Sequence, residues 1–144
     1  MKFVPVYAEE NADTILYELL AEREPKAWIS HERMPTFREH QEFMASRPFW
    51  IWVLIEHEGA YIGMIEATYR NELGIHLFKK HQGKGLGSKA LQLFLDNVQP
   101  LPGLRALRNR RWTANVGIGN EESVNFFRKH GFSTIQQTMV LRDD

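Results

Sequence analysis

A glycine-rich turn between a strand-like and a helix-like segment constrains this 144-residue chain more than any other feature. Its glycines, Gly83, Gly85 and Gly87, stand at alternate positions, and glycine adopts positive φ freely and lets the backbone approach a ligand closely. The first-turn N–H groups of the helix that follows have no partners within the helix, and with the helix dipole they suit a pyrophosphate. The segment therefore predicts an anion site with lysines around it, Lys79, Lys80 and Lys84. The alternative is a turn that only joins strand to helix.

The spacing of this turn excludes two other phosphate-binding motifs. A P-loop requires a glycine, four residues, Gly-Lys and then serine or threonine, but Lys84 is followed by Gly85, and Lys89 follows a serine. The Rossmann fingerprint requires Gly-x-Gly-x-x-Gly, and here the third glycine, Gly87, comes one residue early. The turn therefore belongs to another class of phosphate-binding element.

The hydrophobic pattern predicts an alternation of strands and helices. In chain order we expect a strand at 2–7, helices at 12–23 and 37–45, strands at 50–56, 61–68 and 72–78, a helix at 86–98, a strand at 111–116, a helix at 120–130 and a last strand at 132–141. Thr36 and Glu39 form a capping box at the start of the second helix. An antiparallel meander that leads into a βαβ-like unit gives a mixed α/β (α+β) sheet, which is neither doubly wound nor a barrel.

Composition sets the broad class of the protein. Residues 1–144 fit one domain, with 43% hydrophobic and 25% charged residues and a formal net charge of zero. The absence of cysteine excludes disulfides, a thiol nucleophile and cysteine-ligated metals. No run approaches the roughly 18 apolar residues of a membrane helix, and Glu9 and Glu10 interrupt any signal-peptide layout. The cytoplasm is the expected location, and neither nucleic acid nor a membrane is an expected partner.

Two segments resemble the GNAT superfamily of N-acetyltransferases. Gln82-x-x-Gly85-x-Gly87 resembles the CoA-binding signature of that family. A second segment, residues 116–132, resembles the strand–helix–strand element beside the cofactor, through Val116, Asn120, Ser123, Phe127, Gly131 and Phe132. The resemblance implies a GNAT-like fold, with a mostly antiparallel sheet, a central splay between strands ending near Leu77 and Val116, and flanking helices. It also implies acetyl-CoA (coenzyme A) as the cosubstrate.

The resemblance further implies which residues bind the cofactor. The strand residues Ile75, His76 and Leu77 would pair with the pantetheine arm, and the N–H of Leu77 would polarise the acyl carbonyl. Asn120 would hydrogen-bond near the same arm, and Phe127 would lie beside it. The pyrophosphate would be wrapped by the turn, which consists of Gln82, Gly83, Lys84, Gly85, Leu86, Gly87 and Ser88.

The catalytic groups depart from the family pattern. Phe127 stands where many members carry a tyrosine that protonates the leaving thiolate, and Asn115 stands where some carry a glutamate base. We therefore expect Glu72 to be the general base and His76 to be the second candidate. The alternatives are a solvated strand-end carboxylate and a hydrogen-bonded sheet residue, respectively. Two further residues either line the acceptor pocket or face solvent, Glu66 and Tyr69.

Other candidate features are weaker. His31-Glu32 and His57-Glu58 begin like a zinc-binding helix but lack the second histidine, so we expect no metal site. A basic cluster would contact the cofactor's 3′-phosphate or an anionic acceptor, contact nucleic acid, or form a solvated edge; it comprises Arg105, Arg108, Arg110 and Arg111. The early irregular segment, where the family builds its acceptor pocket, carries Trp28, His31 and Met34.

Together these features imply an N-acetyltransferase that transfers acetyl directly from acetyl-CoA to a primary amine of an unidentified small molecule. Phe127 and Asn115 motivate the first alternative, a non-catalytic CoA-binding module. The second alternative is an acetyltransferase that acts on a protein N-terminus or a nucleic-acid-linked amine. The expected partners are acetyl-CoA and the acceptor, and a homodimer is left open.

Overall fold

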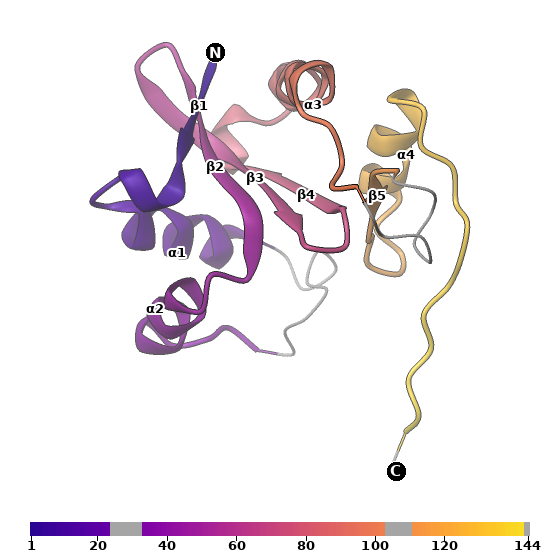
Figure 1. Cartoon of the computed structure of the whole chain (residues 1–144), viewed down its shortest axis with the longest axis horizontal. Helices are drawn as coiled ribbons and strands as arrows, with labels where there is room; N and C mark the ends of the chain where they lie inside the picture. Colours follow the sequence, from indigo (N-terminus) through magenta and orange to yellow (C-terminus); the bar gives the residue numbers. More distant parts are fainter. Residues whose placement is uncertain (24–32, 103–110, 143–144) are drawn as a thin grey trace.

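The computed structural model describes residues 1–23, 33–102 and 111–142. Within these ranges a single sheet has the strand order β1-β2-β3-β4-β5. Its strands are β1 (Lys2–Pro5), β2 (Phe49–His57), β3 (Ala60–Thr68), β4 (Glu72–Leu77) and β5 (Thr113–Ala114). Strands β1 to β4 pair antiparallel, whereas β5 pairs parallel to β4 (Figure 1). The expected mixed sheet, a meander that ends in a parallel crossover, is confirmed.

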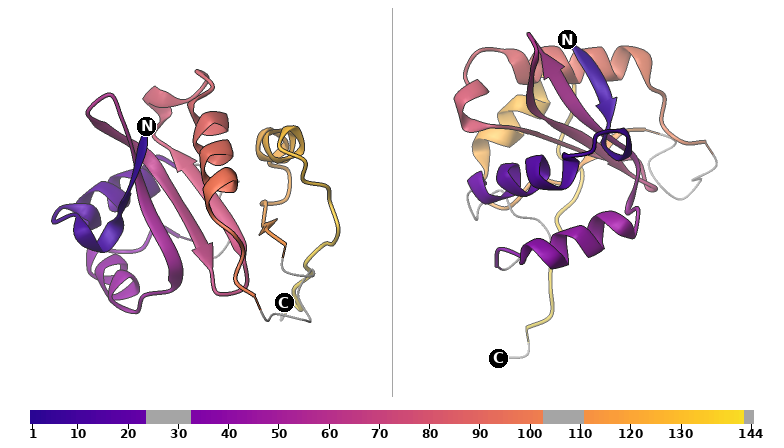
Figure 2. Two further views of the ribbon diagram at one scale, coloured as in Figure 1. Left: turned by 45° about the horizontal axis from the view of Figure 1, so that its top comes forward. Right: turned by 90° about the vertical axis from the view of Figure 1, so that its left-hand side faces the viewer.

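Helices cover both faces of this sheet. Helices α1 (Ala12–Glu22) and α2 (Phe37–Ala45) lie on one face, and α3 (Leu86–Asn97) lies on the other (Figure 2). Helix α4 (Glu121–Lys129) lies beyond β5. The predicted helices are within one residue of these bounds at each end. The capping box at α2 is confirmed, because Thr36 accepts from the Glu39 amide while the Glu39 side chain accepts from the Thr36 amide.

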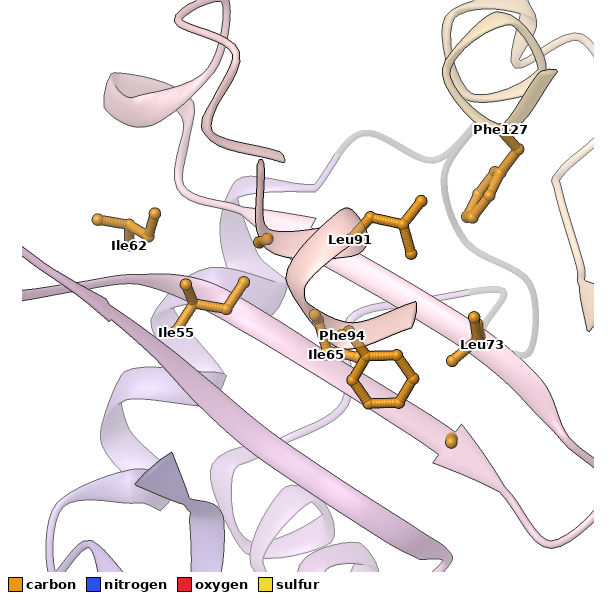
Figure 3. Close-up of a cluster of buried hydrophobic side chains, with 9 residues drawn as sticks. Ile55, Ile62, Ile65, Leu73, Leu91, Phe94 and Phe127 are labelled. Carbon is orange, nitrogen blue, oxygen red and sulfur yellow. The ribbon is translucent and has the colours of Figure 1, made fainter. Parts of the chain in front are cut away.

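Two apolar clusters, one on each face, hold the layers together. On the α3 face, Leu91 and Phe94 pack over Ile55 and Ile65 of the sheet, and all four are at most 1% exposed (Figure 3). On the other face the helices α1 and α2 pack on β2 and β3 through Leu16, Leu19, Met44, Trp52, Leu54 and Met64. Each such side chain contributes about 1.5–3 kcal/mol when it is fully buried. Strand β2 contributes Ile55 to one cluster and Trp52 and Leu54 to the other, so both of its faces are buried.

Strands β4 and β5 stay together for only two residues. The pairs are Glu72 with Thr113 and Leu73 with Ala114, and no other described residue of β4 pairs with β5. The expected central splay is therefore present, and it opens after Leu73. Strand β5 is shorter than the predicted 111–116, because a strand persists only while it has a hydrogen-bonded neighbour.

The predicted last strand at 132–141 is wrong. Residues 132–142 contain no strand, and Figure 1 shows this segment running away from the rest of the molecule. Its apolar side chains are exposed: Ile135 by 58%, Met139 by 91%, Val140 by 70% and Leu141 by 90%. A strand-like pattern forms a strand only beside a partner, and no described strand lies next to this segment.

Asn71 fixes the position from which the splay opens. It lies in the β3–β4 turn with φ of 62° and is 1% exposed. Its side-chain amide donates to the Leu101 carbonyl (3.2 Å) and its Oδ1 accepts from the Leu101 amide (2.8 Å). Its own carbonyl accepts from the Thr113 amide (2.9 Å). One buried side chain thus ties the turn to the segment after α3, and its backbone reaches the start of β5.

We expect Asn71→Ala to lower the free energy of unfolding by about 2–4 kcal/mol, because it leaves both Leu101 backbone groups without partners. Asn71→Gly removes the same bonds but tolerates the positive φ, so it should cost less. Urea denaturation of both variants checks this order. A loss below about 0.5 kcal/mol for Asn71→Ala, the size typical of a surface substitution, would contradict it.

Candidate functional site

A cavity of about 430 Å³ lies on the α1/α2 face of the sheet and reaches the splay. Its walls come from α1, α2, strands β2 to β4, residues 115–117, the N-cap Asn120 and one side of α4 with Ser123 and Phe127. One end is apolar and aromatic, with Phe43, Phe49 and Trp52, whereas the end at the splay is polar. The polar lining includes Arg23, Glu66, Glu72, His76, Asn115 and Asn120.

One edge of β4 faces the splay with its backbone amides. The Phe78 amide donates to the Ile62 carbonyl on β3 (2.9 Å), so Phe78 and Ile62 form a hydrogen-bonded pair. Opposite residues in an antiparallel ladder alternate between hydrogen-bonded and non-hydrogen-bonded pairs. In the observed register, Leu77 lies opposite Gly63 and Ile75 opposite Ile65, so both belong to non-bonded pairs. Their N–H groups therefore point away from β3, toward the gap that β5 leaves.

The glycine turn continues directly from this edge. A 3₁₀ turn, η3 (Lys79–His81), leads from β4 to Gln82, and α3 begins at Leu86. Gly83 and Gly85 both have φ of 75°, and a Cβ built at either meets no atom within 4 Å. The first-turn N–H groups of α3 lack acceptors within the helix. Because the space over both glycines is open and three lysines, Lys79, Lys80 and Lys84, stand in or next to the turn in the sequence, the turn fits an anionic group.

Two contacts fix the turn to its surroundings. The Gln82 side-chain amide donates to the Leu77 carbonyl (2.9 Å), at the end of β4. The Lys79 amide donates to Glu22 Oε2 (2.8 Å), at the end of α1. The side chain of Gln82 is therefore engaged with the protein itself, and it is the backbone of the turn that is left for a ligand.

Glu72, expected to be the base, is held at the start of β4. Its Oε1 accepts from the Thr68 hydroxyl (3.3 Å), and its Oε2 accepts from the Asn115 side-chain amide. Asn115 follows β5 directly, so this contact bridges the two strands where they are still together. Glu72 lines the cavity as well, with both carboxylate oxygens engaged.

His76 shares its part of the cavity with Glu66 and Arg23. His76 Nε2 lies 3.9 Å from Glu66 Oε1, and each of the two side chains is 20% exposed. Burial raises the pKa of Glu66 to about 7, and the positive charge of Arg23 opposes that shift. Burial, together with the positive charge of Arg23, lowers the pKa of His76 to about 3. At neutral pH the imidazole is therefore uncharged, while the Glu66 carboxyl is poised between its two forms.

The two α4 residues expected at the cofactor also line the cavity. Asn120 is the N-cap of α4, and its Oδ1 accepts from the Ser123 amide (3.3 Å). Phe127 is 7% exposed and packs in the α3-face cluster. The structure thus brings Asn120 and Phe127 to the same cavity as Glu72, Ile75 and His76. Residues 82–88 lie outside its lining, at the far end of β4.

Some expected features fall elsewhere. Trp28 and His31, and three of the four clustered arginines, Arg105, Arg108 and Arg110, lie outside the described residues. Tyr69 is 56% exposed and does not line the cavity. Sequence reasoning missed Arg23, which follows α1 and reaches the cavity, because nothing local distinguishes it from a surface arginine.

Over the described ranges, no group of histidine and acidic residues can hold a metal ion, and no helix could cross a membrane.

We expect Gln82→Ala to lower the free energy of unfolding by about 0.5–1 kcal/mol, because it removes the bond to the Leu77 carbonyl. Amide hydrogen exchange should also accelerate in the turn. Gln92→Ala is the matched control, since its amide bonds only to Asp96 on the surface of α3. Equal exchange rates at residues 83–88 in the two variants would contradict an anchoring role for Gln82.

Comparisons with known proteins agree with this geometry. A family model described as "Acetyltransferase (GNAT) domain" matches residues 2–133. A curated protein of Nematostella vectensis, described as an N-acetyltransferase 9-like protein, is 34% identical over 62 residues. That match covers 43% of this chain and 29% of the relative, so it spans less than a third of the relative's length.

Solved structures share the fold. An acetyltransferase from Thermus thermophilus superposes with a TM-score of 0.71 at 21% identity, over 94% of this chain and 88% of that one. A phosphinothricin acetyltransferase from Sinorhizobium meliloti, solved in complex with AcCoA, gives a TM-score of 0.63 at 20% identity, over 92% and 74% of the two chains. At these identities the likeness concerns the fold.

Proposed function

The chain belongs to the GNAT acetyltransferase family, and from that premise we propose that it transfers an acetyl group from acetyl-CoA to a primary amine of a small molecule. Transfer in this proposal is direct from thioester to amine, and the chain has no cysteine that would carry the acyl group. The observation that carries the proposal is the separation of β4 from β5 after Leu73. It places the cavity, the free amide edge of β4 and the glycine turn along one strand.

The cofactor residues follow from this alignment. Bound acetyl-CoA supplies an activated acyl carbon, and the chain's part is to bind and orient it. The backbone of residues 82–88 would hold the pyrophosphate at the N-terminus of α3. The edge amides of Ile75 and Leu77 would bond the pantetheine arm and the acyl oxygen. Asn120 and Phe127 would flank the arm from α4, where both line the cavity.

The acceptor would enter the part of the cavity under α1 and α2. A volume of about 430 Å³ lies within the ~300–1,000 Å³ usual for small-molecule pockets. The aromatic wall of Phe43, Phe49 and Trp52 favours an acceptor with an apolar portion. The sequence named Glu72 and His76 as base candidates, and both line the cavity, whereas Phe127 has no hydroxyl to protonate the thiolate. A thiol titrates near pH ~8.5, so the thiolate leaves readily as an anion.

Turnover is the direct test of this function. We expect release of free thiol from acetyl-CoA in the presence of at least one amine from a panel of benzylamine, spermidine, glucosamine, glycine and trialanine. Trialanine reports on a peptide N-terminus as the acceptor. Mass spectrometry should find the amine heavier by one acetyl group. Thiol release without an acetylated amine would contradict transfer to that acceptor.

We expect Gly85→Glu to weaken CoA binding by about tenfold or more, a change of only about 1.4 kcal/mol. The substitution puts a side chain and a negative charge where the space is open and the helix dipole favours an anion. Calorimetric titration with CoA measures the effect. Gly59→Glu is the matched control, because Gly59 has φ of 78° and an equally open Cβ site in the β2–β3 turn. Equal CoA affinity in both variants would exclude the turn as the pyrophosphate site.

A non-catalytic CoA-binding module is the second candidate. Two observations favour it: Phe127 lacks a hydroxyl, and Asn115, which stands where some members carry a glutamate base, is bonded to Glu72. This candidate requires CoA binding by calorimetry with no thiol release from any amine. An acetyltransferase of nucleic-acid-linked amines would instead require binding to DNA or RNA that falls steeply with salt.

A further inference from the structure

Gly74 leaves room for the Glu66 side chain to lean across β4. The two residues are directly opposite in the β3–β4 register. A Cβ built on Gly74 would lie only 2.6 Å from Glu66 Oε1 and 3.1 Å from its Cγ. The carboxyl of Glu66 therefore covers the backbone of Gly74, which is the first β4 residue after the last pair with β5. It reaches the opening of the splay from the neighbouring strand.

The carboxyl also meets the cavity at its polar end. Glu66 lines it together with Gly74, Ile75 and His76, and the Ile75 amide faces the gap where the acyl group would lie. The other titratable groups of the lining come from three elements: Arg23 at the end of α1, Glu39 and His40 on α2, and Glu72 and His76 on β4. Glu66 is thus placed between the acceptor side of the cavity and the splay.

The other two carboxylates of the lining are engaged. Glu39 forms the α2 capping box and pairs with Arg33, which lowers its pKa to about 2 and makes it a weak base. Glu72 has bonds to Thr68 and Asn115 on its two oxygens. The Glu66 carboxyl makes no hydrogen bond to another described residue, and its partner at ion-pair distance is His76 Nε2, 3.9 Å away. Among these carboxyls it is the one left to meet a substrate.

We propose that Glu66 is the general base that takes the proton from the acceptor's ammonium group, an inference that rests on the proposed acetyl transfer. The Glu66 carboxylate accepts one proton and leaves a neutral amine. The amine nitrogen forms the C–N bond at the acyl carbon as the C–S bond breaks. The second proton of that nitrogen leaves with the thiolate as free thiol, and the carboxyl then releases its proton to solvent.

The surroundings of Glu66 suit this role. A base works best when its pKa lies near the working pH, and burial raises the pKa of Glu66 to about 7. The carboxylate is the form present above that pKa, so activity should fall as the pH drops through about 7. His76 is neutral over this range, because its pKa is lowered to about 3. Its imidazole therefore does not compete with the carboxylate for the proton.

The test compares Glu66→Gln with the wild type, using acetyl-CoA and the panel amine that turns over fastest. We expect kcat to fall by about 100-fold or more, the usual size for loss of a general base. The limb of the pH profile near 7 should disappear, while CoA affinity by calorimetry stays within about twofold. Glu42→Gln is the charge control, because Glu42 is exposed on α2 and pairs with Arg38. It should leave the rate and the pH profile unchanged.

Two further variants test the geometry. Gly74→Ala should displace the carboxyl, since the added Cβ would meet the movable end of Glu66, and it should lower kcat with CoA affinity retained. Glu66→Ala should be rescued in part by added formate, which fits the space and supplies a carboxylate. A merely structural role for Glu66 predicts no rescue. Carboxyl ¹³C NMR of the unliganded protein should show a resonance, absent from Glu66→Gln, that titrates near pH 7.

The outcomes separate this inference from the proposed function. An active Glu66→Gln variant that keeps the wild-type pH profile overturns the role of Glu66 and leaves acetyl transfer standing. Absence of turnover in the wild type with every panel amine overturns both. The role of Glu66 as the base is supported if Glu66→Gln loses both its rate and the limb of the pH profile near 7, and if formate rescues Glu66→Ala.

Discussion

The early separation of β4 from β5 is the constraint on which the rest of the site depends. Backbone N–H and C=O groups inside a fold need partners, and a sheet interior normally supplies them from the next strand. Here β5 pairs only with Glu72 and Leu73, so the amides of Ile75 and Leu77 face a gap beside the cavity. An edge of this kind favours an extended ligand that bonds to the backbone as a strand would.

Hydrogen bonds fix the position of β4 at both of its ends. Asn71 ties the β3–β4 turn to Leu101, and its carbonyl meets the start of β5, so the two strands begin together. Gln82 caps the far end of β4 by bonding to Leu77, so the glycine turn and the N-terminus of α3 stay in line with that strand. Between these anchors, the apolar cluster under α3 keeps β4 in the sheet. The GNAT-like fold and its splay thus follow from a few contacts at defined points.

Charge burial is concentrated at one place in the cavity. Glu66, His76 and Arg23 lie together there, and burial disfavours the charged form of each. A core built for stability alone would use apolar residues at these positions, because burying ionisable groups costs free energy. Perturbed groups of this kind cluster at functional sites. The distribution of charge therefore agrees with a reactive centre at the opening of the splay and with an aromatic acceptor pocket beside it.

Features that depend on neighbours in sequence were predictable from the sequence. The capping box of α2, the strands β2 to β4 and the glycine turn before α3 all arise within a few residues, and each is present. Features that depend on distant partners were not. Residues 132–141 carry a strand pattern but have no adjacent strand among the described residues. The sequence did not decide whether Glu66 lines the pocket or faces solvent, because only the strand register places it opposite Gly74.

The sequence by itself determined the helices, the antiparallel strands of the meander and the position of the glycine turn, because local sterics and periodicity fix them. Only the tertiary structure decided where β4 and β5 part, which carboxyls are already bonded, and that Arg23, Glu66 and His76 share one cavity. These depend on register and packing between segments far apart in the chain, and no local pattern encodes those distances.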